Sequence, residues 1–540
     1  MIQDNLLLIL SLLFTISMLT MISSRVKIPY PIFLVIGGIL ISLIPGIPNI
    51  ALDPELVFLI FLPPLLYAAA WNTSWKEFWR LRRAISMLGF GLVIFTSAAV
   101  ALVSHAIIPD FPLAFGFLLG GIISPPDAVA ATSVLQGLKA PKRVVTILEG
   151  ESLVNDAASL IVFRFAVAAI LTGQFAVLDA SRTFFLVAGM GIAIGLAIAF
   201  VIFAIHRFLP TTPAIDAGIS LISPYIMYVA AEHFHFSGVL SVVTGGLFLT
   251  YHSHKLFSYE SRLNLLSLWD TLIFLLNGFV FILIGLELPV IIDGLGDYSV
   301  SEAIIYALII SLVTIVIRIV WVFPGAYLPR MLSRKIREKE NNPGWKATFL
   351  VAWSGMRGVV SLASALAVPL FLTNGEAFPH RNLILFITFV VIIITLVLQG
   401  LSLRPLIRVL DIQENEKDGL ETQSMLLRIQ LAETVLSFID TNYSEQVTNI
   451  ETYKRVRDRY ERMIEVTKKR LENEAGTSDD DPVRFYLPMY RRMLVEVVDV
   501  RRQELNRARV SGEYSEELIR ERERELDLEE ARLKTMKTSG

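Results

Sequence analysis

The sequence predicts an all-α polytopic membrane protein with a charged, helical tail. Of its 540 residues, 54% are hydrophobic and 18% are charged, and the mean hydropathy is +0.59. Residues 1–410 hold 25 Lys and Arg and 21 Asp and Glu, about 11% of that stretch, whereas about 40% of residues 411–540 are charged. A soluble chain of this length would instead divide into domains of roughly 150 residues. We therefore expect a membrane domain over 1–410 and a tail over 411–540.

Thirteen apolar runs are long enough to be membrane-spanning helices. A bilayer core about 30 Å thick requires about 20 mostly apolar residues per helix. The predicted spans are 4–23, 30–48, 55–71, 85–108, 112–136, 148–171, 182–204, 215–231, 235–251, 269–292, 302–329, 346–370 and 382–406.

The distribution of Lys and Arg between the predicted loops gives the orientation. Alternate loops separate into one set with 18 basic residues and another with two, Arg182 and Arg381. Because basic residues favour the cytoplasmic side, the N-terminus is expected outside and the tail in the cytoplasm. The chain has no cysteine, which excludes disulfides, thiolate metal sites and cysteine nucleophiles, and the net charge of −2 gives no reason to expect nucleic acid.

A few ionisable side chains interrupt the apolar spans. Each costs about 2.5 to 3.5 kcal/mol at a helix centre, so each needs a partner or a function. Those that carry the interpretation below are Asp127, Glu151, Asp156, Arg318 and Arg357. A further one, Arg164, is expected to extend to the membrane surface or to meet an acid such as Asp179.

The fifth span, LLGGIISPPDAVAATSVL, is predicted to break in the middle of the membrane. Pro125 and Pro126 remove two backbone donors and free the carbonyls of Gly121 and Ile122. Irregular backbone at that depth is tolerated only inside the protein or beside a wet cavity. Freed carbonyls can bind a cation, and Asp127 can cap the second half-helix. The alternative is a simple proline kink capped by an aspartate.

The sixth span, LEGESLVNDAASLIVFRF, has one polar face. Helical spacing aligns Glu151 with Asn155, and Ser152 with Asp156 and Ser159. Such oxygen ligands suit a small alkali cation. A carboxylate in a low dielectric could bind Na⁺ or H⁺ but not both together, which is the minimal chemistry of an antiporter. The alternative is a polar stripe that joins helices by hydrogen bonds.

Two arginines within the membrane are natural counter-charges for these acids, because neither loses its proton easily. Arg318 lies in the eleventh span, and Arg357 lies between Gly355 and Gly358 in a twelfth span that also looks interruptible. Two interrupted spans at corresponding positions of two halves are typical of inverted-repeat transporters, with the ion site where the spans cross.

With these residues in place, the chain resembles the monovalent cation:proton antiporters of the CPA1 family, which includes NhaP-type bacterial Na⁺/H⁺ antiporters and animal sodium/proton exchangers. The resemblance covers essentially residues 1–410. The segments that carry it are FLPPLLY (61–67), SPPDAVA (124–130), GESLVNDA (150–157), HFSGVLSVVTGG (235–246) and WSGMRGVVSLASAL (353–366).

The resemblance implies roles for the residues of the site. Asp156 matches the ion- and proton-carrying aspartate, Ser152 a hydroxyl ligand, Asp127 the acid beside the unwound crossing, and the carbonyl of Pro126 a backbone ligand. Many bacterial members have Thr where this chain has Pro126, so the side-chain hydroxyl that those members offer the ion is missing here.

A second set of matched residues supports the first. Glu151 and Arg318 match an intramembrane ion pair that Asn155 holds in place. Arg357 matches the arginine of the second broken helix, with a structural or pH-linked role. Electrogenic relatives carry a second aspartate at position 155, so Asn155 implies electroneutral exchange of one Na⁺ for one H⁺.

For the whole protein, the resemblance implies a secondary active Na⁺(Li⁺)/H⁺ antiporter, not an enzyme, that works without a cofactor in pH and sodium homeostasis. It would be a homodimer in the bacterial plasma membrane. A mobile core (85–171 and 302–406) would move against a dimerisation part (4–71 and 182–292), while the role of the tail stays open between regulation and support of the dimer. A K⁺/H⁺ antiporter on the same scaffold is the nearest alternative. A cation channel is disfavoured because no selectivity-filter loop is found, and an intramembrane protease because the acids accompany Asn, Ser and Arg.

Overall fold

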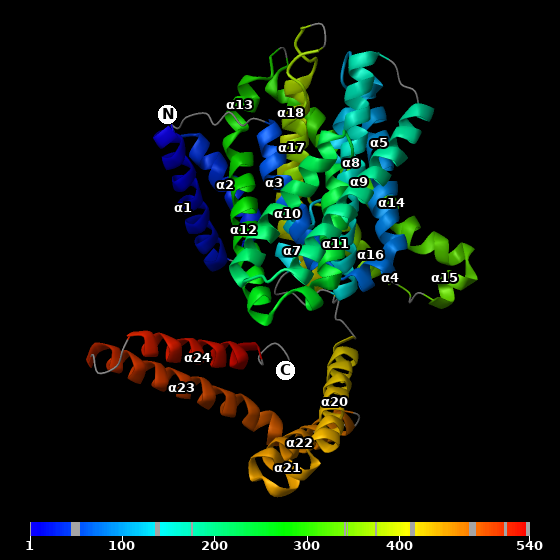
Figure 1. The fold of residues 1–540 in the computed structure, drawn as a ribbon. Coiled ribbons are helices and arrows are strands. Elements are labelled where there is room, and N and C mark those ends of the chain that lie inside the picture. The colour runs from blue at the N-terminus through cyan, green and yellow to red at the C-terminus, as the bar shows by residue number, and fades with distance from the viewer. Residues whose placement is uncertain are drawn as a thin grey trace. The chain divides into compact units, whose positions relative to one another are not determined.

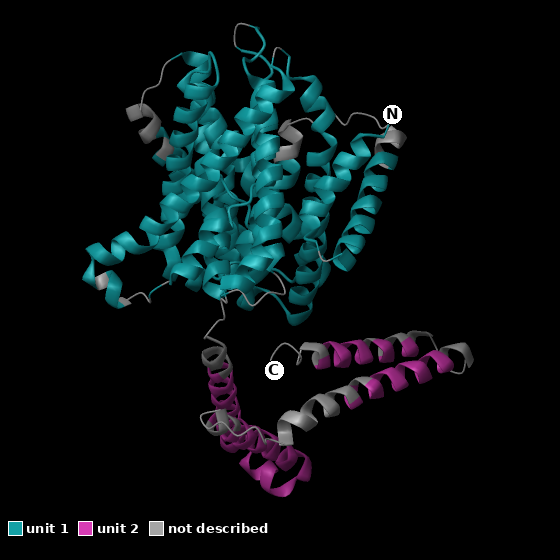
Figure 2. Cartoon of the chain, turned by 180° about the vertical axis from the view of Figure 1, so that it is seen from behind, with its two compact units in different colours: residues 1–413 teal, residues 414–540 magenta. Residues whose placement is uncertain are grey.

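The computed structural model describes residues 2–26, 28–44, 54–135, 141–173, 177–296, 298–339, 342, 344–372, 375–410, 416–474, 482–511 and 516–535. The chain forms two compact units, residues 1–413 and 414–540, which are coloured separately in Figure 2. Nine helices in the described ranges are long and apolar enough to cross a membrane, and two further apolar helices are shorter. The predicted all-α, polytopic membrane class is confirmed.

Each of the thirteen predicted spans lies mainly on one helix or on consecutive helices of the first unit (Figure 1). These elements are α1 (Ile2–Val26), α2 (Tyr30–Ser42), α3 (Pro54–Asn72), α4 (Trp75–Ser86), η1 (Met87–Leu92), α5 (Val93–Ile107), α6 (Leu113–Ile123), α7 (Ala128–Leu135), α8 (Lys142–Thr172), α9 (Val177–Phe208), α10 (Pro213–His233), α11 (Gly238–Leu256), α12 (Tyr259–Leu286), α13 (Leu288–Asp293), α14 (Val300–Leu332), α15 (Arg334–Lys339), α16 (Trp345–Trp353), α17 (Val359–Leu366), α18 (Arg381–Ile394), η2 (Thr395–Gln399) and α19 (Gly400–Leu410).

Local sequence determines where the two longest helices of the site begin and end. α8 begins directly after Pro141, and it ends at Gly173, whose φ of 68° is a left-handed conformation that glycine adopts without a steric penalty. α14 begins with a capping box, in which Ser299 accepts from the backbone of Glu302 and the Glu302 side chain accepts from the backbone of Ser299. These ends fix the register of the polar residues along each helix.

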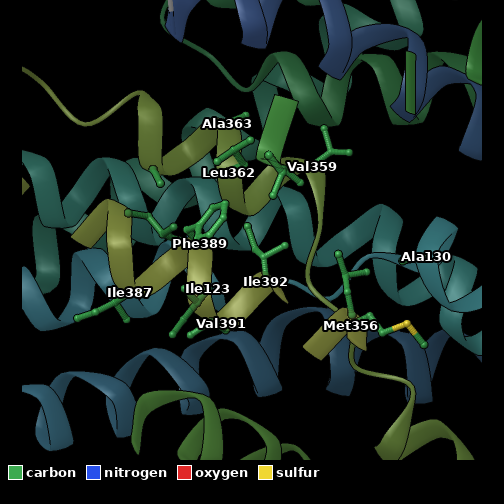
Figure 3. Packing of buried hydrophobic residues seen from close by; sticks show 14 of the residues in the cluster. Ile123, Ala130, Met356, Val359, Leu362, Ala363, Ile387, Phe389, Val391 and Ile392 are labelled. Atoms are coloured by element: carbon green, nitrogen blue, oxygen red, sulfur yellow. The ribbon is translucent and has the colours of Figure 1, made fainter. Parts of the chain in front are cut away.

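Two of the predicted spans are interrupted. The fifth span consists of α6 and α7, and the twelfth consists of α16 and α17, each pair separated by residues outside any helix. Apolar side chains pack around both interruptions, and Figure 3 shows Ile123 at the end of α6, Ala130 on α7, Met356 in the second interruption, Val359 at the start of α17, and Ile392 on α18. All five are at most 5% exposed. This enclosure satisfies the requirement that irregular backbone at membrane depth be buried in protein.

The helices of the first unit pack in two groups. The first group contains α5, α6, α8, α14, α16, α17 and α18, and the second contains α1, α2, α3, α9, α10, α11 and α12. At the border, α8 and α17 of the first group contact α3 of the second, and α17 also contacts α12. The site described below lies at this border.

The second unit is helical and rich in ion pairs. Its elements are α20 (Glu416–Asn442), α21 (Ser444–Asn449), α22 (Glu451–Glu474), α23 (Pro482–Ser511) and α24 (Glu516–Thr535). α20 packs on α22 through pairs such as Arg457 with Asp440, and α23 packs on α24 through pairs such as Arg502 with Glu530. These pairs are partly exposed, so each contributes at most about 1 kcal/mol.

Candidate ion-binding site

The first interruption places a carboxylate at the start of a half-helix. Residues 124–127 separate α6 from α7, and Asp127 Oδ1 accepts hydrogen bonds from the backbone N–H groups of Val129 at 2.8 Å and Ala130 at 3.4 Å. Asp127 therefore caps α7, as the sequence predicted. Its other carboxylate oxygen is buried and lies against the backbone of Gly358, at the start of α17.

The second interruption, residues 354–358, touches the first through the backbone. The N–H of Asp127 donates to the carbonyl of Met356 at 2.6 Å. A Cβ atom at Gly358 would overlap a carboxylate oxygen of Asp127. The two interruptions can approach this closely only because residue 358 is glycine.

Arg357 joins the two interruptions. Its side chain is fully buried, and it donates from Nε to the carbonyl of Ile123 at 2.9 Å and from Nη1 to the carbonyl of Gly355. Its own backbone N–H donates to the hydroxyl of Thr395 at 3.1 Å. Arg357 forms no direct ion pair with an acid in the described residues, and its side chain bonds carbonyls freed where the helices stop.

Glu151 and Arg318 form a buried ion pair between α8 and α14. The two Nη atoms of Arg318 lie 2.5 and 2.9 Å from the two Glu151 oxygens, and both side chains are at most 1% exposed. Arg318 also donates to the carbonyl of Val351 at 3.1 Å. A bidentate pair with additional hydrogen bonds is the arrangement that best offsets the cost of burying two charges.

Asn155 bonds a different group from the one expected. Its Nδ2 donates to the carbonyl of Pro126 at 3.2 Å, and its Oδ1 has no hydrogen-bond partner among the described residues. No hydrogen bond joins its side chain to Glu151 or Arg318 in the described residues, and the bond it makes secures the first interruption. The Pro126 carbonyl keeps its second lone pair for another donor or a cation.

A cavity of about 50 Å³ lies beside the interruptions. Its lining includes Asp127, Asp156, Ser152 and Pro126, the four residues predicted to bind the ion. The residues predicted to support them, Glu151, Asn155, Arg318 and Arg357, are not among the lining residues. A volume of this size can hold a few water molecules or a partly hydrated monovalent cation.

Asp156 lacks a counter-charge in the described residues, and Asp127 is held by backbone N–H groups rather than by a basic side chain. The Asp156 side chain faces the cavity, is 6% exposed, and takes part in no hydrogen bond or ion pair with the described residues. An isolated ionised carboxylate in such surroundings is costly, so a proton or a cation must neutralise it. Carboxylate, hydroxyl and carbonyl oxygens around one small cavity are suitable ligands for a hard monovalent cation.

Arg164, farther along α8, forms an ion pair with the second helix group. Its Nη2 lies 2.6 Å from Glu232 Oε2 at the end of α10, and the two side chains are 46% and 28% exposed. The other Glu232 oxygen accepts from the N–H of Gly238. The suggested partner, Asp179, has a side chain outside the described residues, and Glu232 was not predicted.

Two further polar residues line the cavity and were not predicted as site residues. Asn277 on α12 and Ser361 on α17 each have a buried side-chain atom without a partner in the described part of the chain. Asn277 could have been noticed as the single amide in the apolar run LIFLLNGFVFILIGL. Its proximity to Asp156 depends on how α12 packs, which the local sequence does not indicate.

Comparisons with known proteins identify the family. The family model described as "Sodium/hydrogen exchanger, transmembrane" matches residues 9–409. A sodium, potassium, lithium and rubidium/H⁺ antiporter of Bacillus pumilus is 35% identical over 385 residues, which are 70% of this chain and 57% of that protein. An uncharacterized Na⁺/H⁺ exchanger of Mycobacterium tuberculosis is 32% identical over 527 residues, 95% of this chain and 93% of that protein.

Among solved structures, the sodium proton antiporter MjNhaP1 from Methanocaldococcus jannaschii at pH 8 matches with a TM-score of 0.59 and 18% identity. The match covers 74% of this chain and 99% of that chain, and at this identity it shows a shared fold. The resemblance drawn from the sequence motifs is thereby confirmed. The chain belongs to the sodium/hydrogen exchanger family of membrane transporters and has the fold of the NhaP-type CPA1 antiporters.

Proposed function

We propose that the protein is a secondary active antiporter that exchanges Na⁺ or Li⁺ for H⁺, with cation and proton competing for Asp156. The observation that carries the proposal is the cavity, where a carboxylate without a counter-charge faces a second acid, a hydroxyl and a backbone carbonyl. Because one carboxylate cannot hold a proton and a cation together, binding of one requires release of the other.

The proposed stoichiometry is one Na⁺ for one H⁺. Arg318 neutralises Glu151, and position 155 is an amide, so Asp156 is the charge that cycles. Asp127 is tied to the start of α7 by two backbone hydrogen bonds and is proposed to contribute negative charge without exchanging its own proton. Exchange in proteoliposomes should then be independent of a potassium diffusion potential set with valinomycin.

The proposed mechanism is alternating access by a homodimer in the bacterial plasma membrane, with the N-terminus outside and the tail in the cytoplasm. The mobile core would comprise 85–171 and 302–406, and the dimerisation part 4–71 and 182–292. The cavity supports this division, because both groups line it: its acids and its serines come from the first, and four apolar residues of α3 come from the second. A relative movement of the groups would expose the same residues to each side in turn.

The deciding experiment is fluorescence dequenching of a pH dye in everted vesicles on addition of Na⁺, Li⁺ or K⁺. Wild-type protein should respond to Na⁺ and Li⁺, and Asp156→Asn should abolish the response. The matched control is Asp216→Asn, since Asp216 is a buried aspartate on α10 that bonds His206 at 2.9 Å and does not line the cavity. Full activity of Asp156→Asn would overturn the mechanism.

A K⁺/H⁺ antiporter is the second candidate. Pro126 supplies no side-chain hydroxyl to the cavity, and the Bacillus pumilus relative is described as a transporter of potassium as well as sodium. A dye response to K⁺ alone would establish this alternative. Cation currents without proton movement would indicate a channel.

A further inference from the structure

Each helix group forms one wall of the cavity. The first group and its interruptions contribute the polar residues Asp127, Ser152, Asp156 and Ser361, together with apolar residues such as Leu153 and Val359. The second group contributes four apolar residues of α3 and, from α12, Asn277. Within the described part of the chain, Asn277 is thus the polar lining residue of that wall.

Asn277 has no structural partner that would explain its burial. Its side chain is 1% exposed, and its Nδ2 forms no hydrogen bond in the described residues. An unsatisfied buried amide costs about 1 to 3 kcal/mol. Buried polar groups without a protein partner normally pair with water or a ligand, and the space next to this amide is the cavity that contains Asp156.

An amide is suited to both forms of the site. Its oxygen is a neutral ligand for a cation, while its NH₂ group can donate to a carboxylate or a water molecule. Unlike a third acid, it adds a ligand without adding charge, so it leaves the one-for-one exchange intact.

We propose that Asn277 is a specificity-determining residue of the transport site, contacting the cation or its retained water from the wall opposite Asp156. This inference rests on the proposed antiporter function and extends it to α12. Because alkali cations differ in size and in how firmly they hold water, a neutral ligand on the far wall alters their relative affinities. Asn277 belongs to the helix group against which the mobile core is proposed to move. It would therefore contact the cation only in those orientations of the core that place Asp156 near α12.

The test replaces the amide by an apolar side chain of similar size. Reconstituted full-length wild type and Asn277→Leu are compared for exchange rate against Na⁺, Li⁺ and K⁺ concentration. For Asn277→Leu we expect the KM for Na⁺ to rise about tenfold, as for loss of one hydrogen bond to a charged group. The order of preference among the three ions should change, while kcat changes little. Asn277→Ser, which keeps an oxygen, should recover part of the affinity.

The matched control is Gln399→Leu. Gln399 is a fully buried amide on η2 whose Oε1 and Nε2 lack partners among the described residues, but it does not line the cavity. It should keep the wild-type KM and ion order. Equal KM values and the same ion order in Asn277→Leu and wild type would overturn the proposal.

A binding measurement separates this inference from the proposed function. Ligands that bind the folded state raise Tm, so Tm of the purified protein is measured in NaCl, LiCl and KCl and, as the reference, in choline chloride. A Na⁺-dependent rise in wild type that is reduced in Asn277→Leu would support the site even if no exchange were detected. An equal rise in Tm in both proteins would overturn the role of Asn277. If the wild type showed neither cation/proton exchange nor a rise in Tm with any of the three cations, both proposals would be overturned.

Discussion

Glu151 shows how a single charged side chain can be kept inside the membrane unit. Its two oxygens are both bonded by Arg318, and neither residue lines the cavity. The pair therefore acts as an internal support for α8, the helix that carries Asp156. Removing one partner leaves the other as an uncompensated buried charge, which is far more costly than removing both.

Glu151→Gln should therefore lower the free energy of unfolding by about 3 to 5 kcal/mol, because Arg318 remains buried without its counter-charge. The double variant Glu151→Met/Arg318→Met should lose less than the single variant. Both effects can be measured as thermal or denaturant unfolding of the purified protein in detergent. A double variant less stable than Glu151→Gln would contradict the interpretation of the pair as mutual compensation.

At the scale of the element, the interrupted helices are held by their contact with each other. The Asp127 N–H donates to the Met356 carbonyl, and Arg357 bonds the Ile123 carbonyl at the end of α6. Groups that would be unpaired at the end of one interrupted helix are thus satisfied by the other. The contact also explains why a glycine occupies position 358.

Gly358→Ala should strongly impair exchange, because its Cβ would overlap the carboxylate of Asp127 and force the two interruptions apart. Gly218→Ala on α10 is the matched control, since a Cβ there meets no atom within 4 Å. That control should be neutral or slightly stabilising, as Ala is favoured over Gly in a helix by about 1 kcal/mol. Membrane insertion, Tm and vesicle exchange are measured for both variants, and normal exchange by Gly358→Ala would exclude this account of the crossing.

Parts of these elements could be predicted from the sequence because their causes are local. Pro125 and Pro126 remove two backbone donors from the fifth span, and helical spacing alone places Ser152 beside Asp156. The partner of Asn155, by contrast, lies 29 residues away, and the cavity contact of Asn277 depends on how separate helices pack. Patterns along one helix therefore indicated which acids line the cavity. They did not indicate which residues of other helices lie across from those acids.

At the scale of the whole molecule, the two units differ in their relation to the family. The sodium/hydrogen exchanger match ends at residue 409, and the first compact unit ends at 413. The second unit has its own packing and its own ion pairs, such as Arg501 with Glu529. On the proposed function, the transport site lies in the first unit, which holds every lining residue of the cavity.

A chain truncated after residue 413 should insert and exchange Na⁺ for H⁺ with the same Na⁺ dependence as the full chain, because every residue of the cavity precedes that point. The measurement is dye dequenching in everted vesicles at matched protein levels. If the truncated protein were present at normal levels and inactive, the second unit would have to be part of the working transporter.

The Arg164–Glu232 ion pair has a consequence for the balance between transport states. It joins α8 to α10, so on the proposed mechanism it forms in one orientation of the core and breaks in the other. Being partly exposed, it is worth at most about 1 kcal/mol, which is a factor of about five in the populations of the two orientations. Dissolved salt screens such a pair, so ionic strength would shift the resting orientation of the empty carrier independently of the transported ion.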